Sequence, residues 1–114
     1  MNFKYTIIDK NGYSNIAIIG KFIEQHQADE MLYDIEHHIL SDKNKFVIDL
    51  SKLEFINQNG ISVLIKILTL ARKNGGDVIL SDLSESLLEN ADGKKLKQVF
   101  TSSENEFLAA ALLT

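Results

Sequence analysis

The stretch from Phe46 to Leu64, FVIDLSKLEFINQNGISVL, decides the fold of this chain. It begins with an apolar run at residues 46–48, which is typical of a strand covered on both faces. A short linker follows, and the chain is expected to re-enter the core at Phe55 and Ile56. The polar residues 57–60 then precede an apolar pattern with helical spacing. The stretch therefore predicts a strand, a turn and a helix in succession.

The turn at residues 57–60 is where we expect the chain to meet other molecules. Asn57 or Asn59 can cap the helix that follows, because a side-chain carbonyl oxygen accepts from an otherwise unpaired amide of the first turn. Backbone N–H groups point outward at a helix start, and the helix dipole favours negative charge there. The sequence thus predicts an exposed and chemically addressable helix start.

The same stretch resembles the signature segment of the STAS domain, the module shared by anti-sigma-factor antagonists and sulphate transporters. The family pattern is apolar-apolar-Asp-Leu-Ser, a spacer, then Phe-apolar-Asp-Ser-Ser/Ala-Gly-apolar. Here these positions are residues 47–51 and 55–61, and similar residues recur at 71–76, 78–80 and 83–84. The resemblance covers nearly the whole chain. It implies one α/β domain of STAS type over residues 1–114, with a mixed sheet of four to five strands packed by about four helices.

One departure from the family pattern bears on function. In phosphorylated antagonists, the residue immediately before the glycine is the serine that a partner kinase modifies. Here that position is Asn59, which has no hydroxyl, and the two preceding family positions are Asn57 and Gln58. The resemblance therefore implies a phosphosite-equivalent position that cannot be phosphorylated in the family manner.

The function that the resemblance implies is protein–protein regulation of transcription without catalysis. An anti-sigma-factor antagonist binds an anti-sigma factor that is also an ATP-dependent serine kinase, and so frees the sigma factor. Two alternatives remain open. One is a STAS subunit that binds the ATPase of a lipid-transport complex, and the other is a small-ligand-binding module that uses a cleft around Asp49, Glu54 and the Asn57 turn.

The expected partner surface combines the polar turn with the start of the helix. Val63, Ile67 and Leu70 form a second apolar stripe on this helix, which either packs under neighbouring helices or adds an apolar patch beside the turn. Gly60 is expected to let the backbone of a partner approach closely. The predicted partner-binding residues are Asn57, Gln58, Asn59, Gly60, Ile61, Ser62 and Val63.

The rest of the chain supplies further strands and helices. Residues 3–9 and 13–19 alternate like the strands of an antiparallel hairpin. The remaining segments are a loop at 21–27, helices at 27–41, 58–74 and 84–90, strands at 45–50 and 78–80, an irregular turn at 91–93, a short edge strand at 97–100, and a last helix at 104–113 capped by Ser103 with Glu106 in a capping box.

Composition excludes several classes of protein. With 114 residues, 45% hydrophobic and 25% charged, the chain is long enough for one globular domain. It has no cysteine, which excludes disulfides and zinc–thiolate sites. The net charge of −4 argues against nucleic acid as a partner. No signal-peptide core and no apolar run of about 20 residues is present, so we expect a cytoplasmic protein without direct membrane insertion.

Residues that could support catalysis or bind a metal do not form a recognisable pattern. His37 and His38 are adjacent on a predicted helix, so their side chains diverge by about 100° and cannot share one ion. His26 lies apart from them, and no serine occupies a nucleophile-elbow context. Residues 75–76 are two glycines that follow a helix and precede a strand, which is the reverse of a phosphate-binding loop. The sequence therefore predicts no enzyme, no cofactor and no metal site.

Overall fold

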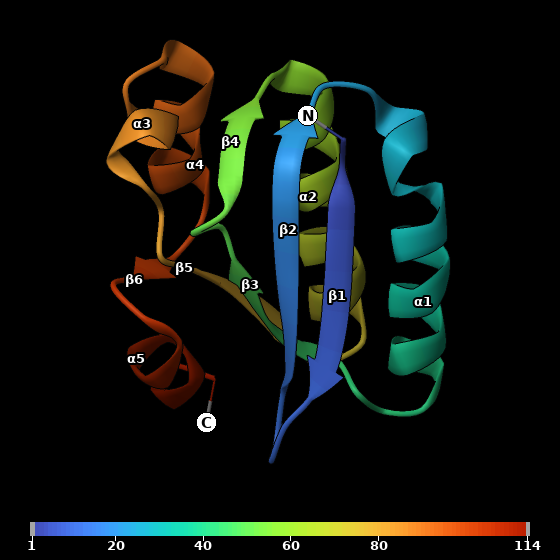
Figure 1. Cartoon of the computed structure of the whole chain (residues 1–114). Coiled ribbons are helices and arrows are strands. Elements are labelled where there is room, and N and C mark those ends of the chain that lie inside the picture. Colours follow the sequence, from blue (N-terminus) through green and yellow to red (C-terminus); the bar gives the residue numbers. More distant parts are fainter. Residues whose placement is uncertain (1, 114) are drawn as a thin grey trace.

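The computed structural model describes residues 2–113, which form one mixed sheet with helices on both of its faces (Figure 1). The elements, in chain order, are β1 (Lys4–Asp9), β2 (Ser14–Phe22), a 3₁₀ helix η1 (Gln25–Ala28), α1 (Asp29–Leu40), β3 (Lys45–Asp49), β4 (Leu53–Ile56), α2 (Gln58–Lys73), β5 (Asp77–Ser81), α3 (Glu85–Leu88), α4 (Ala91–Val99), β6 (Ser102–Ser103) and α5 (Glu106–Ala111).

Strand β2 is the central support of the sheet. The strand order is β1-β2-β3-β5-β6, and β4 pairs separately with β2. Among the strand pairs of residues 2–113, the β1–β2 pair is antiparallel and the others are parallel, which confirms the predicted hairpin. Because β2 is nine residues long, its first half pairs with β3 and its end pairs with β4, with a register shift between Gly20 and Lys21. The described residues thus contain six strands, whereas the sequence predicted four to five.

Two hydrophobic clusters hold the layers together. The larger cluster packs α1 and α2 against one face of the sheet and includes the fully buried Ile16 and Ile48. The smaller cluster packs α5 onto Val47 and Ile79 on the opposite face. Successive strand residues point to opposite faces, so the apolar run 46–48 fills both clusters. This confirms the prediction of a strand covered on both sides.

The second apolar stripe of α2 belongs to the core. Val63 is 4% exposed and Ile67 is 0% exposed, so at these two positions the stripe packs against neighbouring elements, and the alternative of an apolar patch beside the turn is wrong there. Leu70 is only half-buried. The stripe is buried because α2 lies between the sheet and the neighbouring α1 and α4, so more than one of its faces meets protein.

The region after α3 differs from its prediction. Residues 91–99 form helix α4 rather than an irregular turn and an edge strand, and Asn90 caps it by accepting from Gly93 N at 2.7 Å. A Cβ at Gly93 would lie 1.7 Å from the Leu87 carbonyl oxygen, so this glycine permits close packing of α4 on α3. The edge strand is β6 instead.

The last helix begins later than expected. Its cap is Asn105, whose Oδ1 accepts from Leu108 N at 2.9 Å, and the predicted Ser103 cap is wrong because this residue belongs to β6. The helix ends at Ala111. Among residues 2–113, no helix has the length and apolar character needed to cross a membrane.

Candidate protein-docking site at the start of helix α2

Asn57 caps helix α2, which decides between the two asparagines that the sequence offered for this role. Its backbone is extended, and its Oδ1 accepts from Asn59 N at 3.0 Å and from Gly60 N at 3.3 Å. The cap thereby satisfies two of the first-turn amides that a helix leaves unpaired. The first turn contains no acidic residue, so the positive end of the helix dipole meets no carboxylate within its own helix. Asn59 lies in this first turn with an exposed side chain.

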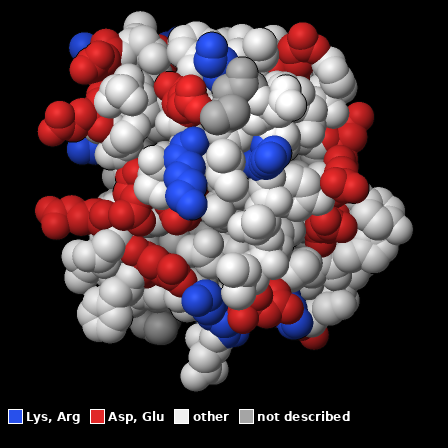
Figure 2. Space-filling view, viewed as in Figure 1, with Lys and Arg blue, Asp and Glu red and all other residues white. Residues whose placement is uncertain are grey.

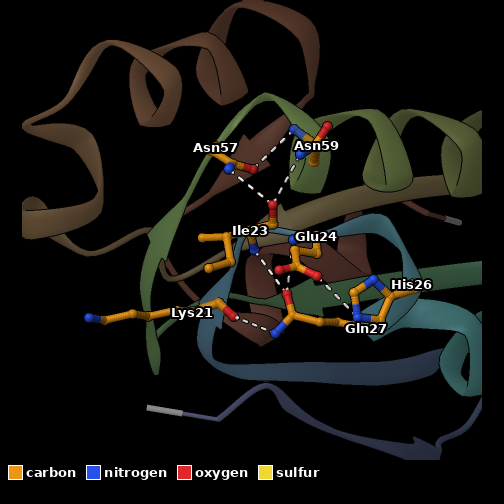
Figure 3. A network of polar contacts seen from close by, with 7 residues as sticks. All are labelled: Lys21, Ile23, Glu24, His26, Gln27, Asn57 and Asn59. Carbon is orange, nitrogen blue, oxygen red and sulfur yellow. Dashed lines mark hydrogen bonds and ion pairs between the residues drawn. The ribbon is translucent and has the colours of Figure 1, made fainter.

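The side-chain amides of Asn57 and Asn59 converge on one carbonyl group. Figure 3 shows both amides directed at the Ile23 oxygen, with Asn57 Nδ2 at 3.0 Å and Asn59 Nδ2 at 3.1 Å. On the other side, Gln27 Oε1 accepts from the backbone N–H groups of Ile23 and Glu24, both at 3.0 Å. The loop after β2 and the start of α2 are therefore joined by side chains. Sequence reasoning missed this link, because it predicted a loop at residues 21–27 without a contact between that loop and the helix start.

A glycine is needed at position 60 for a reason that differs from the predicted one. It is buried, and a Cβ at this position would lie 2.7 Å from both the Phe22 carbonyl oxygen and Ile56 Cγ1. The helix start can therefore approach β2 only where residue 60 lacks a side chain. The expectation that Gly60 makes room for a partner is wrong, because its neighbours belong to the same chain.

Only part of the predicted partner surface is accessible. Gly60, Ile61 and Val63 are buried, so they add no exposed side chain to this surface. Gln58 and Asn59 are exposed, and Asn57 and Ser62 are half-buried. The Ser62 hydroxyl donates to the Gln58 carbonyl oxygen at 2.9 Å, within the first turns of the helix. The polar half of the predicted surface therefore remains available.

Two apolar side chains near the turn are exposed instead of Val63 and Ile67. Ile23 is 36% exposed and Phe55 is 39% exposed. Phe55 pairs in register with Lys21, two residues before Ile23, so both apolar residues border the same end of the sheet. The alternation of a strand could have indicated that Phe55 and Ile56 point to opposite sides, and only Ile56 reaches the core.

A basic side chain of α4 adjoins the turn. Lys95 Nζ donates to Gln58 Oε1 at 3.2 Å and lies 3.7 Å from Asp92. The basic cluster at residues 94–97 is otherwise a solvent-exposed helix face, apart from the buried Leu96. Figure 2 shows acidic and basic side chains interspersed on one face of the molecule, with no continuous basic tract on that face.

Other candidate groups have ordinary structural roles. Asp49 accepts from Ser51 N at 2.8 Å, which stabilises the turn after β3. Each histidine has a local contact, namely His26 with Glu24, His37 with the Tyr33 carbonyl oxygen, and His38 with Asp9 and the Asp34 carbonyl oxygen. In the described part of the chain, no group of three His, Cys, Asp or Glu side chains is arranged to hold a metal ion.

A separate polar cluster lies at the hairpin end of the molecule, away from the start of α2 (Figure 1). Asp9 accepts from Lys43 Nζ at 2.7 Å, from Ser14 Oγ at 3.0 Å and contacts His38 Nε2 at 2.9 Å. These contacts, that of Lys43 above all, lower the pKa of Asp9 to about 2. The cluster ties the hairpin to the segment that links α1 and β3.

This arrangement of one mixed sheet, with α1 and α2 on one face and α5 on the other, defines a single-domain α/β protein of the SpoIIAA-like fold. A family model for the STAS domain matches residues 9–107, and the chain belongs to this family.

Three solved structures show how closely the fold is shared. The anti-sigma factor antagonist SpoIIAA in its unphosphorylated form is 14% identical, with a TM-score of 0.71 over 96% of this chain and 94% of that chain. The Bacillus SpoIIAA in its phosphorylated form is 14% identical, with a TM-score of 0.67 over 96% and 98%. A putative antagonist from Thermotoga maritima is 18% identical, with a TM-score of 0.70 over 97% and 93%.

Proposed function

We propose that this chain is a non-enzymatic regulator that acts as an anti-sigma-factor antagonist in the cytoplasm. In this role it binds an anti-sigma factor that is also a serine kinase, and so releases a sigma factor. The observation that carries the proposal is the position of Asn59, exposed in the first turn of α2 at the place where the family pattern has its modified serine.

The proposed docking surface has a polar part and an apolar part. Asn57, Gln58 and Asn59 supply amide groups, and Ile23 and Phe55 supply exposed apolar area beside them. A specific interface generally combines an apolar centre with a polar rim. Exposed apolar side chains next to a helix start suit such a surface better than the buried Val63 does.

The protein is proposed to lack the covalent switch of its phosphorylated relatives. A phosphate at the helix start would add about two negative charges and oppose docking through repulsion and desolvation. The Asn59 carboxamide has no hydroxyl to accept a phosphoryl group. Ser62 has the only hydroxyl in residues 57–62, and it already donates within the helix. The unmodified surface would therefore be permanent.

Calorimetric titration tests the docking proposal with each anti-sigma factor of the serine-kinase type that the same genome encodes. The variants are Ile23→Glu and Asn59→Asp, and the matched control is Leu40→Glu, which changes an exposed leucine on α1. We expect both site variants to lose affinity and the control to bind like the wild type. Equal affinity in all three variants would place the interface elsewhere.

Intact-mass measurement after incubation with the binding kinase and ATP tests the missing switch. We expect no phosphate on residues 57–62, and a phosphate mapped to Ser62 would contradict the proposal. If no kinase binds but the ATPase of a lipid-transport complex does, the lipid-transport alternative replaces the antagonist role. A thermal-shift screen with nucleotides and small acids addresses the ligand-binding alternative.

A further inference from the structure

We infer that Asn59 is a latch: its side-chain amide holds the loop of residues 23–24, which leads into η1, against the start of α2, so that Ile23 forms a fixed part of the docking surface. The latch concerns the conformation of the free protein. Its consequence for binding deepens the proposed function and rests on it.

The backbone of Ile23 is held from two sides by side chains. Ile23 follows the last residue of β2, so the strand ladder no longer supports it. Its N–H donates to Gln27 Oε1, and its carbonyl oxygen accepts from both Asn57 and Asn59 (Figure 3). A carbonyl oxygen has two lone pairs, so these two donors use its full capacity. Next to it, Asn57 N donates to the Phe22 carbonyl oxygen at 3.3 Å.

An asparagine at position 59 suits this contact better than a serine or an aspartate would. Gly60 lets the start of α2 approach β2 closely. The Asn59 side chain, with its amide one methylene group away from the backbone, is then long enough to reach the Ile23 oxygen. Serine is shorter, and its hydroxyl does not extend that far. Aspartate has the right length but only acceptor atoms, so a carboxylate oxygen would face the carbonyl oxygen.

The roles of the two asparagines separate the latch from the helix cap. Asn57 uses its Oδ1 for the cap and its Nδ2 for Ile23, whereas Asn59 contributes only its Nδ2. Asn59 is therefore unnecessary for starting the helix, and its amide acts on the loop alone. A loop that is already ordered loses less conformational freedom when a partner binds. The half-exposed Ile23 side chain then meets the partner in a prepared position.

Hydrogen exchange of the full chain tests the latch without any partner. The amides to follow are those of Ile23 and Glu24, and the variants are Asn59→Ala and Asn59→Ser. We expect both variants to exchange about fivefold faster at these amides, the ratio that corresponds to one hydrogen bond of about 1 kcal/mol. The matched control is Gln58→Ala, because the exposed Gln58 contacts Lys95 of α4 and makes no bond to the loop. It should exchange like the wild type.

A double variant removes both donors but keeps the helix cap. Asn57→Asp retains an oxygen that accepts from the first-turn amides, and a carboxylate is favourable at a helix start. Combined with Asn59→Ala, it leaves the Ile23 carbonyl oxygen without a side-chain donor. Helix content by circular dichroism should be kept while the loop amides exchange faster still. Wild-type exchange in this double variant would overturn the latch.

Binding provides a separate outcome. Calorimetry of Asn59→Ala with the serine-kinase anti-sigma factor that binds the wild type should show weaker affinity in parallel with the faster exchange. Faster exchange with unchanged affinity would overturn the role of the latch in docking and leave the proposed function intact. If no such factor binds the wild type, the proposed function fails, while the exchange result still decides whether the latch exists.

Discussion

Replacing Gly60 by alanine sets two physical effects against each other. Alanine has the higher helix propensity, and this alone would stabilise α2 by about 1 kcal/mol. The added Cβ, however, would lie 2.7 Å from the Phe22 carbonyl oxygen, 2.7 Å from Ile56 Cγ1 and 3.0 Å from Phe22 Cγ. Overpacking of this kind costs about 1–3 kcal/mol, and the backbone oxygen cannot turn aside as a flexible side chain would. Subtracting the propensity gain from this cost, we expect a net destabilisation of up to about 2 kcal/mol.

Urea unfolding followed by circular dichroism shows directly whether Gly60→Ala raises or lowers the free energy of unfolding. The control is Ser62→Ala, which removes a half-buried hydroxyl bonded within the same helix and should change the free energy of unfolding by less than about 0.5 kcal/mol. A Gly60→Ala variant that is more stable than the wild type would refute the reasoning. Propensity would then exceed the steric effect, and α2 would not lie as close to β2 as the contacts of Gly60 require.

Two further predictions concern the core and the hairpin end. Ile48→Ala and Leu64→Ala should each lower the unfolding free energy by about 2–5 kcal/mol, because both side chains are fully buried; urea melts with less than about 1 kcal/mol for both would contradict this. The Asp9 carboxyl, with its ordinary pKa of 3.8 lowered to about 2, contributes stability above pH 3.8 that is lost as the pH falls towards about 2. Since the Asp9 side chain is 44% exposed, this contribution should stay below about 1 kcal/mol. In thermal melts between pH 3.8 and about 2, the Asp9→Asn variant should therefore lose less stability than the wild type does. If both proteins lose the same stability over this pH range, the cluster does not stabilise the fold in this way.

The strand-turn-helix unit could be predicted because its signals are local. The apolar run 46–48, the capping Asn57 and the helical spacing after it all act within a few residues of one another. Strand β4 was harder to predict, because only two of its four side chains are buried and its partner β2 lies about 30 residues earlier. The sequence shows Phe55 and Ile56 as equally apolar, and only the sheet decides which of them faces the core.

Tertiary packing also outweighed local preference in α4. Glycine disfavours a helix interior, so residues 91–93 resemble a turn in sequence. In the fold, Gly93 lies against the Leu87 carbonyl oxygen, where any larger residue would collide. The close approach of α3 and α4 therefore requires the glycine that the propensity scale counts against the helix. No local pattern contains that information.

The contact of Asn59 with Ile23 could not be predicted from a local sequence pattern either, because its acceptor is a backbone oxygen. The two residues are 36 positions apart, and every residue carries a carbonyl group, so no side-chain pattern marks Ile23 as the acceptor. The sequence shows only that position 59 lacks a hydroxyl, which leads to a statement about a missing modification. In the fold, the carboxamide also carries a donor that reaches the Ile23 carbonyl oxygen, whereas the hydroxyl of the serine in the family pattern is too short to do so. One substitution thus removes a phosphoryl acceptor and supplies an amide that orders the neighbouring loop. On the proposed function, both effects favour a single uncharged state of the docking surface, so that control of such a protein would lie elsewhere than in phosphorylation at this position.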